Sequence, residues 1–87
     1  MARVLVVFRE GLAQESRVRD GIDLALAALA FDHEVTVLFT GAGAALPGEG
    51  GELAANLRAL AYHGATVLAA DADAHDPLAH ADHVFAC

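Results

Sequence analysis

Carboxylate and imidazole side chains crowd the chain between positions 71 and 83, and both groups are ligands for zinc and related metals. The acids are Asp71, Asp73, Asp76 and Asp82, and the histidines are His75, His80 and His83. The spacing fixes no ligand set, because His80 and His83 share one face only if a helix continues to residue 83, where a strand is expected. We therefore expect a solvated acidic, histidine-rich surface and no bound metal.

The single cysteine, Cys87, ends the last predicted strand. Sulfur chemistry needs the thiolate, which a nearby cation or a helix amino terminus would favour. Neighbouring acids such as Asp82 predict the opposite, a raised thiol pKa. We therefore assign no catalytic residue. One alternative stays open, in which Cys87 accepts sulfur on a flexible terminus with help from His83 or from a partner's cation.

Gly41 and Gly43 follow a predicted strand, as the glycines of a dinucleotide-binding fingerprint do. The comparison fails because Leu46 stands at the third glycine position, Pro47 follows, and the turn comes after the second strand instead of the first. Glycine and proline punctuation predicts a plain loop over residues 41–51, and no cofactor is expected. A small-ligand binding module built on this loop is a further alternative, although few polar groups converge there.

The elements that must position these groups alternate between strands and helices. Residues 3–8 predict a buried strand, because the run from Val4 to Phe8 is apolar without a polar alternation, which is typical of a parallel strand covered on both faces. A helix from Glu15 or Ser16 to about Phe31 and a strand over 34–40 follow. The intervening length predicts a parallel pair with a right-handed crossover, and ligands of such sheets bind at the carboxyl ends of the strands.

The rest of the chain continues the same alternation. A second helix ends at Gly64, a strand covers 65–70, Asp76-Pro77 opens another helix, and a strand covers 84–87. We therefore predict one α/β domain over residues 1–87, with three α/β/α layers and a mainly parallel sheet of about four strands.

The first helix is apolar on two sides. One stripe runs through Val18, Ile22, Ala25 and Leu29, and the other runs through Leu24, Ala28 and Phe31. One side would pack on the sheet and the other on a neighbouring subunit. Exposed alanines without any function are the alternative. A 56% hydrophobic content in 87 residues favours a partner, because so small a domain leaves apolar groups at its surface. The predicted interface residues are Ile22, Leu26, Leu29 and Phe31.

Composition excludes other classes of protein. A net charge of -7 with five Lys and Arg residues opposes direct nucleic acid binding, which depends on cations that neutralise phosphates. No apolar run approaches the roughly 18 residues of a membrane span, and one cysteine forms no internal disulfide framework. The amino terminus lacks a signal-peptide pattern, so we expect a cytoplasmic protein.

Five segments in this order resemble the DsrE/DsrF/DsrH superfamily of sulfur-relay proteins, most closely its DsrF or TusC branch. They are Val6-Val7-Phe8, residues 19–27 and 31–39, Ala45-Leu46-Pro47-Gly48, and Ala81-Asp82-His83-Val84-Phe85. The resemblance implies α/β subunits that assemble as homo-oligomers or as DsrEFH or TusBCD heterocomplexes. Such assemblies carry persulfide sulfur in sulfur oxidation or in tRNA 2-thiolation.

The resemblance also implies which subunit type this is. The sulfur-bearing cysteine of the DsrE or TusD type ends the strand that corresponds to residues 65–70, where this chain has Ala69 and Ala70. Cys87 aligns with a large apolar residue of the family, and residues 71–80 replace a longer connection. The sequence thus predicts a noncatalytic DsrF/TusC-like subunit that joins itself or DsrE- and DsrH-type chains. A small sulfurtransferase that uses Cys87 is the alternative.

Overall fold

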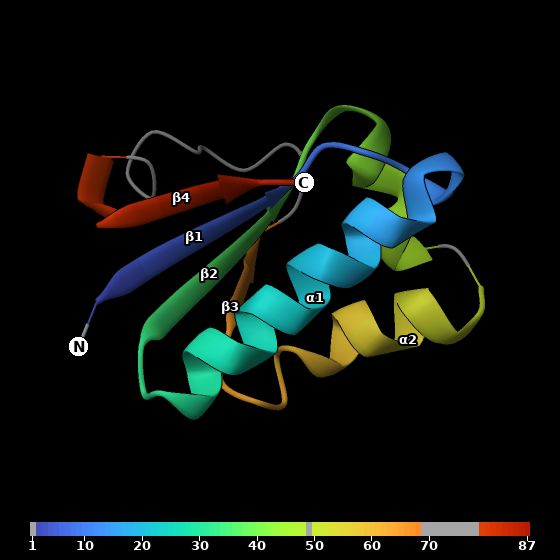
Figure 1. The fold of residues 1–87 in the computed structure, drawn as a ribbon. Helices are drawn as coiled ribbons and strands as arrows, with labels where there is room; N and C mark the ends of the chain where they lie inside the picture. Colours follow the sequence, from blue (N-terminus) through green and yellow to red (C-terminus); the bar gives the residue numbers. More distant parts are fainter. Residues whose placement is uncertain (1, 49, 69–78) are drawn as a thin grey trace.

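A computed structural model of the chain describes residues 2–48, 50–68 and 79–87. At its centre is a sheet in the order β3-β2-β1-β4, in which all neighbouring strands are parallel (Figure 1). The strands are β1 (Arg3–Phe8), β2 (Glu34–Phe39), β3 (Thr66–Leu68) and β4 (His83–Ala86). The predicted α/β class and parallel four-stranded sheet are confirmed, and the described part of β3 begins one residue after the predicted start.

Two α-helices, α1 (Glu15–Ala30) and α2 (Glu52–Ala59), lie on the same face of this sheet (Figure 1). Short 3-10 segments precede α1 and follow β2, namely η1 (Leu12–Gln14) and η2 (Gly41–Gly48). The sequence predicts a further helix that Asp76-Pro77 opens in the segment before β4. Most of that segment, including Asp76-Pro77, lies outside the described residues. Within the described ranges, no helix has the length and apolar character that a membrane crossing requires.

The main core lies between the helices and the sheet. Alternate side chains of β1, namely Val4, Val6 and Phe8, point to this face, and the rings of Phe8 and Phe39 stack with centroids 5.4 Å apart. Buried side chains from α1 and α2 complete this core: Val18, Ile22, Ala25, Ala28, Leu53, Leu57 and Leu60. Leu5, Val7 and Leu38 are buried on the opposite face. The prediction that β1 is covered on both faces is thus confirmed.

The chain between α1 and β2 turns sharply. The Phe31 N–H donates to the carbonyl oxygens of Ala27 and Ala28, both at 3.2 Å, and the His33 N–H donates to Ala28 at 3.1 Å. Asp32 between them adopts the left-handed conformation with φ of 63°, which short polar side chains tolerate. The turn therefore holds Phe31 at a defined place just beyond the helix. Gly64 adopts φ of 106°, as predicted for a left-handed stop, although α2 itself ends at Ala59 and turns cover residues 60–64.

Candidate functional site

Cys87 lies directly after β4 at the carboxyl edge of the sheet. Its backbone N–H donates to the carbonyl oxygen of Val7 at 2.8 Å. Its own carbonyl oxygen accepts from the N–H groups of Arg9 at 2.8 Å and Glu10 at 3.2 Å. These bonds hold the main chain of Cys87 in line with β1. The structure therefore differs from the flexible terminus that a sulfur-accepting Cys87 was expected to use.

The Cys87 thiol is half-buried against α1. A Cβ atom added at Gly21 would lie 2.8 Å from Cys87 Sγ and 2.5 Å from Phe8 Cε1, so sulfur and ring both occupy the space that a glycine leaves. Gly21 is buried within the chain, where its missing side chain leaves room for Phe8 and Cys87.

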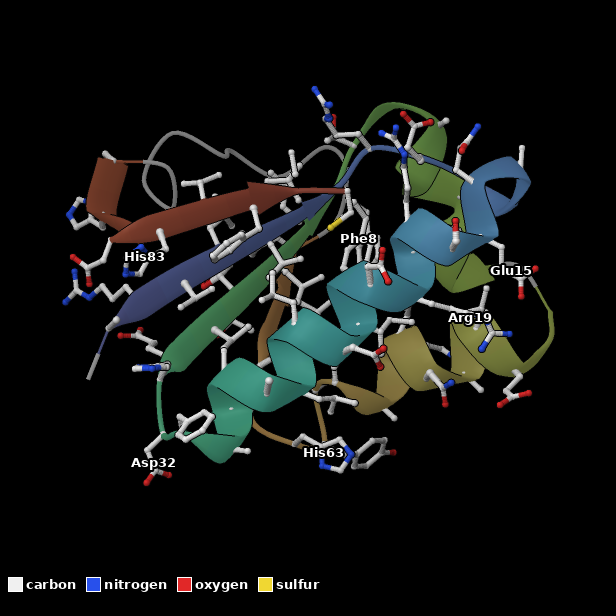
Figure 2. The ribbon with its side chains drawn as sticks, in the orientation of Figure 1. Phe8, Glu15, Arg19, Asp32, His63 and His83 are labelled. Carbon is white, nitrogen blue, oxygen red and sulfur yellow. The ribbon has the colours of Figure 1, made fainter. Side chains whose placement is uncertain are left out.

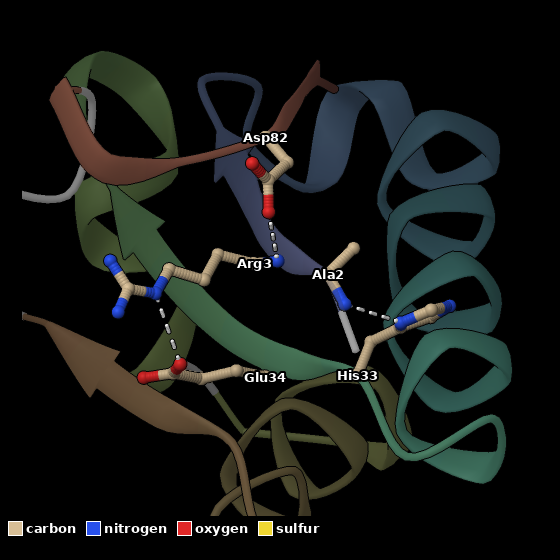
Figure 3. Close-up of polar contacts among 5 residues, drawn as sticks. All are labelled: Ala2, Arg3, His33, Glu34 and Asp82. Atoms are coloured by element: carbon tan, nitrogen blue, oxygen red, sulfur yellow. Dashed lines mark hydrogen bonds and ion pairs between the residues drawn. The ribbon is translucent and has the colours of Figure 1, made fainter.

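Burial raises the pKa of the Cys87 thiol, and the nearby Asp20 carboxylate raises it further. The predicted direction is confirmed, but the predicted cause is corrected. Asp82 lies at the opposite end of β4, where its Oδ2 accepts from the Arg3 N–H at 2.8 Å (Figure 3). The acid that acts on the thiol therefore comes from α1 and not from the adjacent sequence.

The Gly41 to Gly43 turn packs against the end of β1. The Gly43 N–H donates to the carbonyl oxygens of Arg9 at 3.1 Å and Thr40 at 3.0 Å. A Cβ atom at Gly43 would collide with the carbonyl oxygen of Phe8. This glycine therefore lets one backbone touch another, which supports the plain-loop interpretation. Residues 41–48 are wound into 3-10 turns, more regular than the predicted loop. We call Phe8, Gly21, Gly43 and Cys87 the closed edge.

Two of the three candidate metal-binding histidines, His80 and His83, lie among the described residues. His75 lies outside the described residues. His80 belongs to a helical turn and His83 begins β4, so they do not share the helix face that a ligand pair would need. Among the residues that the structure describes, no three His, Cys, Asp or Glu side chains are arranged to hold a metal ion.

The predicted interface residues of α1 differ in exposure. Ile22 is 5% exposed and belongs to the core, because its stripe, shared with Val18 and Ala25, faces the sheet. Leu29 is partly buried against that core. Leu26 is 38% exposed and Phe31 is 78% exposed. Ile22 is thus unavailable to a partner in this conformation, and the interface prediction is left with Leu26, Leu29 and Phe31.

An apolar groove of about 230 Å³ separates the last turns of α1 from β4. Its walls include Ala27, Ala28 and Phe31 at the end of α1, His33 after it, and His83 and Phe85 of β4. The groove exists because α1 packs over β1 and β2, while His83 and Phe85 of the edge strand pair with Val4 and Val6 and so face the helix side. We call it the edge groove.

Sequence reasoning missed the edge groove, including the role of His33. The His33 Nδ1 accepts the backbone N–H of Ala2 at 3.0 Å, which fixes the ring beside the start of β1 (Figure 3). The continuous apolar run Val84-Phe85-Ala86 of the last strand was a usable signal, because it indicates that this strand needs a cover. It does not show that α1 stops short of the strand.

A second hollow, of about 310 Å³, lies at the opposite end of α1 and is lined by Glu15, Arg19, Gly51 and Glu52 among others. Arg19 donates from Nε at 3.1 Å and Nη2 at 2.7 Å to Glu15 Oε1, and this hydrogen bond and the carboxylate charge raise the Arg19 pKa. Glu15 and Arg19 lie toward one end of α1, Asp32 and His83 toward the other (Figure 2). The polar and apolar hollows are therefore well separated.

Comparison with known proteins gives one positive finding. A search of curated proteins finds no match to the chain. The model of the DsrE/DsrF-like family matches residues 2–76, which include β1, β2, β3 and both α-helices, whereas β4 and Cys87 lie beyond the match. The match confirms the resemblance at the level of the superfamily. The chain belongs to the DsrE/DsrF-like family.

Proposed function

We propose that this chain is a noncatalytic, DsrF/TusC-like subunit of a cytoplasmic sulfur-relay assembly, and that it acts by packing against sibling subunits. Membership of the DsrE/DsrF-like family supports a role related to sulfur relay. The state of the single thiol is the observation that carries the noncatalytic part of the proposal.

A sulfur carrier must form a persulfide. Its thiolate attacks the outer sulfur of a donor persulfide, the donor S–S bond breaks, and the donor leaves as a thiolate. Cys87 suits this step poorly, because burial beside Phe8 and Gly21 and the charge of Asp20 all disfavour its thiolate. No second cysteine exists in the chain, and positions 69 and 70 hold alanine.

The exposed end of α1 supports the assembly part of the proposal. Phe31 is 78% exposed and Phe85 is 40% exposed, and both line the edge groove. Exposed apolar surface of this kind marks interaction sites when it forms one continuous patch. A domain of 87 residues also has a small core, so burial of this surface would add to a marginal stability.

Analytical ultracentrifugation and pull-down with co-expressed DsrE- and DsrH-type chains test the assembly. We expect either self-association or a stable complex with these siblings at micromolar concentration. A strict monomer that also captures neither sibling would contradict the proposal.

Sulfur loading separates the proposed subunit from a sulfurtransferase. The chain is incubated with a small persulfide donor and examined by intact-mass spectrometry, with Cys87→Ser as the blank and a DsrE-type cysteine protein as the positive control. We expect the positive control to gain sulfur while Cys87 stays unmodified. Sulfur on Cys87 at the rate of the positive control would establish the sulfurtransferase alternative instead.

A further inference from the structure

We infer that the edge groove receives the Phe31 side chain of a second copy of this chain, so that two copies exchange Phe31 about a two-fold axis. The inference deepens the proposed assembly function and rests on it. It names the partner, a second copy, and the contact through which that copy is recognised.

The protruding ring and the hollow that would receive it lie on one surface. Phe31 is 78% exposed, and it also forms part of the groove wall. Two-fold pairing brings the same patch of two copies together, so a ring beside a groove on one copy meets a groove beside a ring on the other. A single two-fold rotation therefore places the Phe31 ring of each copy in the groove of the other.

The size of the groove favours a side chain over a free ligand. Pockets for small molecules occupy about 300–1,000 Å³, whereas the edge groove measures about 230 Å³. Its walls come mostly from alanine, phenylalanine and histidine side chains, which suit an aromatic ring.

Charge along α1 also favours a second copy. All charged residues of the helix lie between Glu15 and Asp23, and residues 24–31 are uncharged. Two copies can therefore meet at this end although each chain carries a net charge of -7. Among the described carboxylates at this end, Glu34 pairs with Arg3 at 3.4 Å and Asp82 accepts the Arg3 N–H. Asp32 is exposed and would accompany Phe31 toward the imidazoles of the partner's His33 and the partner's His83. Acid on the inserted segment and imidazole on the receiving groove are complementary.

The turn after α1 prepares Phe31 for insertion. The backbone hydrogen bonds from Phe31 to Ala27 and Ala28 and the left-handed Asp32 fix the point from which the ring leaves the helix. Phe31 therefore loses less conformational freedom on association than it would if a mobile segment carried it.

Sedimentation equilibrium of the whole chain tests the inference. We expect a monomer–dimer equilibrium for the wild type, and a dimer at least about 100-fold weaker for Phe31→Ala, because two anchoring rings are lost per dimer. Tyr62→Ala is the matched control, since Tyr62 is an exposed aromatic residue, at 93%, that does not line the groove. Its dimer should be unchanged.

A variant that fills the groove, and leaves the inserted ring unchanged, gives a sharper test. Ala27 lies exposed on the groove wall, so Ala27→Leu should block insertion and leave Phe31 intact. Each variant alone should be a folded monomer by circular dichroism. Mixing Phe31→Ala with Ala27→Leu should produce a heterodimer, because the ring of the second variant can enter the open groove of the first. That rescue requires that Phe31 of one copy enters the groove of the other copy.

The remaining outcomes are distinct. A monomeric wild type that still binds DsrE- or DsrH-type siblings would overturn the Phe31 exchange and leave the proposed function standing. A monomer that binds neither itself nor a sibling would remove both. A dimer that both variants leave unchanged, or two weakened variants that show no rescue on mixing, would place the interface elsewhere and overturn the inference.

Discussion

The two ends of the sheet have opposite packing. At the carboxyl ends of β1 and β4, the closed edge brings Phe8, Gly21, Gly43 and Cys87 together with no room for an added methyl group. At the amino ends of the same strands, the edge groove leaves about 230 Å³ between α1 and β4, with Phe31 and Phe85 exposed.

This difference bears on function because parallel sheets bind their ligands at the carboxyl ends of the strands. Here, between β1 and β4, that position is occupied by the chain's own thiol and ring. The unfilled apolar surface lies at the other end. The contrast supports a subunit whose role is contact with other chains rather than chemistry at the usual edge, and the predictions below test it from either end.

The largest expected effect comes from truncation of one phenylalanine at each end. Phe8 is fully buried and stacks on Phe39, so Phe8→Ala should lower the free energy of unfolding by about 3–5 kcal/mol. Phe31 is mostly exposed, and Phe31→Ala should change the monomer's unfolding free energy by no more than about 0.5 kcal/mol.

Urea denaturation followed by circular dichroism measures both values, at concentrations low enough to keep the chain monomeric. Equal losses for the two variants would show that Phe31 belongs to the core of the monomer. The contrast between a closed and an open end of the sheet would then be wrong.

A smaller effect is expected from an added methyl group at the closed edge. Gly43→Ala places a Cβ atom against the Phe8 carbonyl oxygen, and the backbone must shift to relieve the contact, at a cost of about 1–3 kcal/mol in unfolding free energy. Gly48→Ala is the matched control in the same 3-10 segment, since a Cβ atom there has no neighbour within 4 Å. Equal melting temperatures for the two variants in thermal denaturation would contradict the close approach of this turn to β1.

Much of the fold could be predicted from the sequence because its signals are local. The continuous apolar run of β1, the two apolar stripes of α1 and Gly64 each determine structure within a few residues. The order of the elements then requires parallel pairing. The family resemblance depended on the same local segments.

The sites were harder to predict because they depend on distant neighbours. Gly21 receives Cys87 from the far end of the chain, and the acid that acts on the thiol is Asp20 rather than Asp82. Ile22 was assigned to an interface because a helix with two apolar stripes does not reveal which stripe faces the sheet. The edge groove depends on the position of β4 relative to α1, and the periodicity of a sequence does not reveal that position.

The reactivity of Cys87 tests the closed edge chemically. A half-buried thiol whose pKa is raised, chiefly by burial and then by Asp20, should react with iodoacetamide more slowly than the same cysteine in urea, by about tenfold or more at neutral pH. Gly48→Ala serves again as a control with wild-type rates. Equal rates in the folded and unfolded chain would mean that the thiol is open, which would revive the sulfurtransferase alternative.

The smallest expected effect is the pH dependence of stability that this thiol produces. Above the ordinary thiol pKa of 9.0 the unfolded chain releases a proton that the folded chain still holds, because burial and Asp20 raise the pKa of Cys87 in the folded state. Rising pH therefore favours unfolding in this range, and stability is lost from about pH 9 upward to the raised pKa. Cys87→Ala lacks this proton. The unfolding free energy of the wild type should therefore fall relative to that of the variant over the same pH interval. A constant difference from pH 8 to 10 would show that the thiol ionises alike in both states and that the closed edge does not shield it.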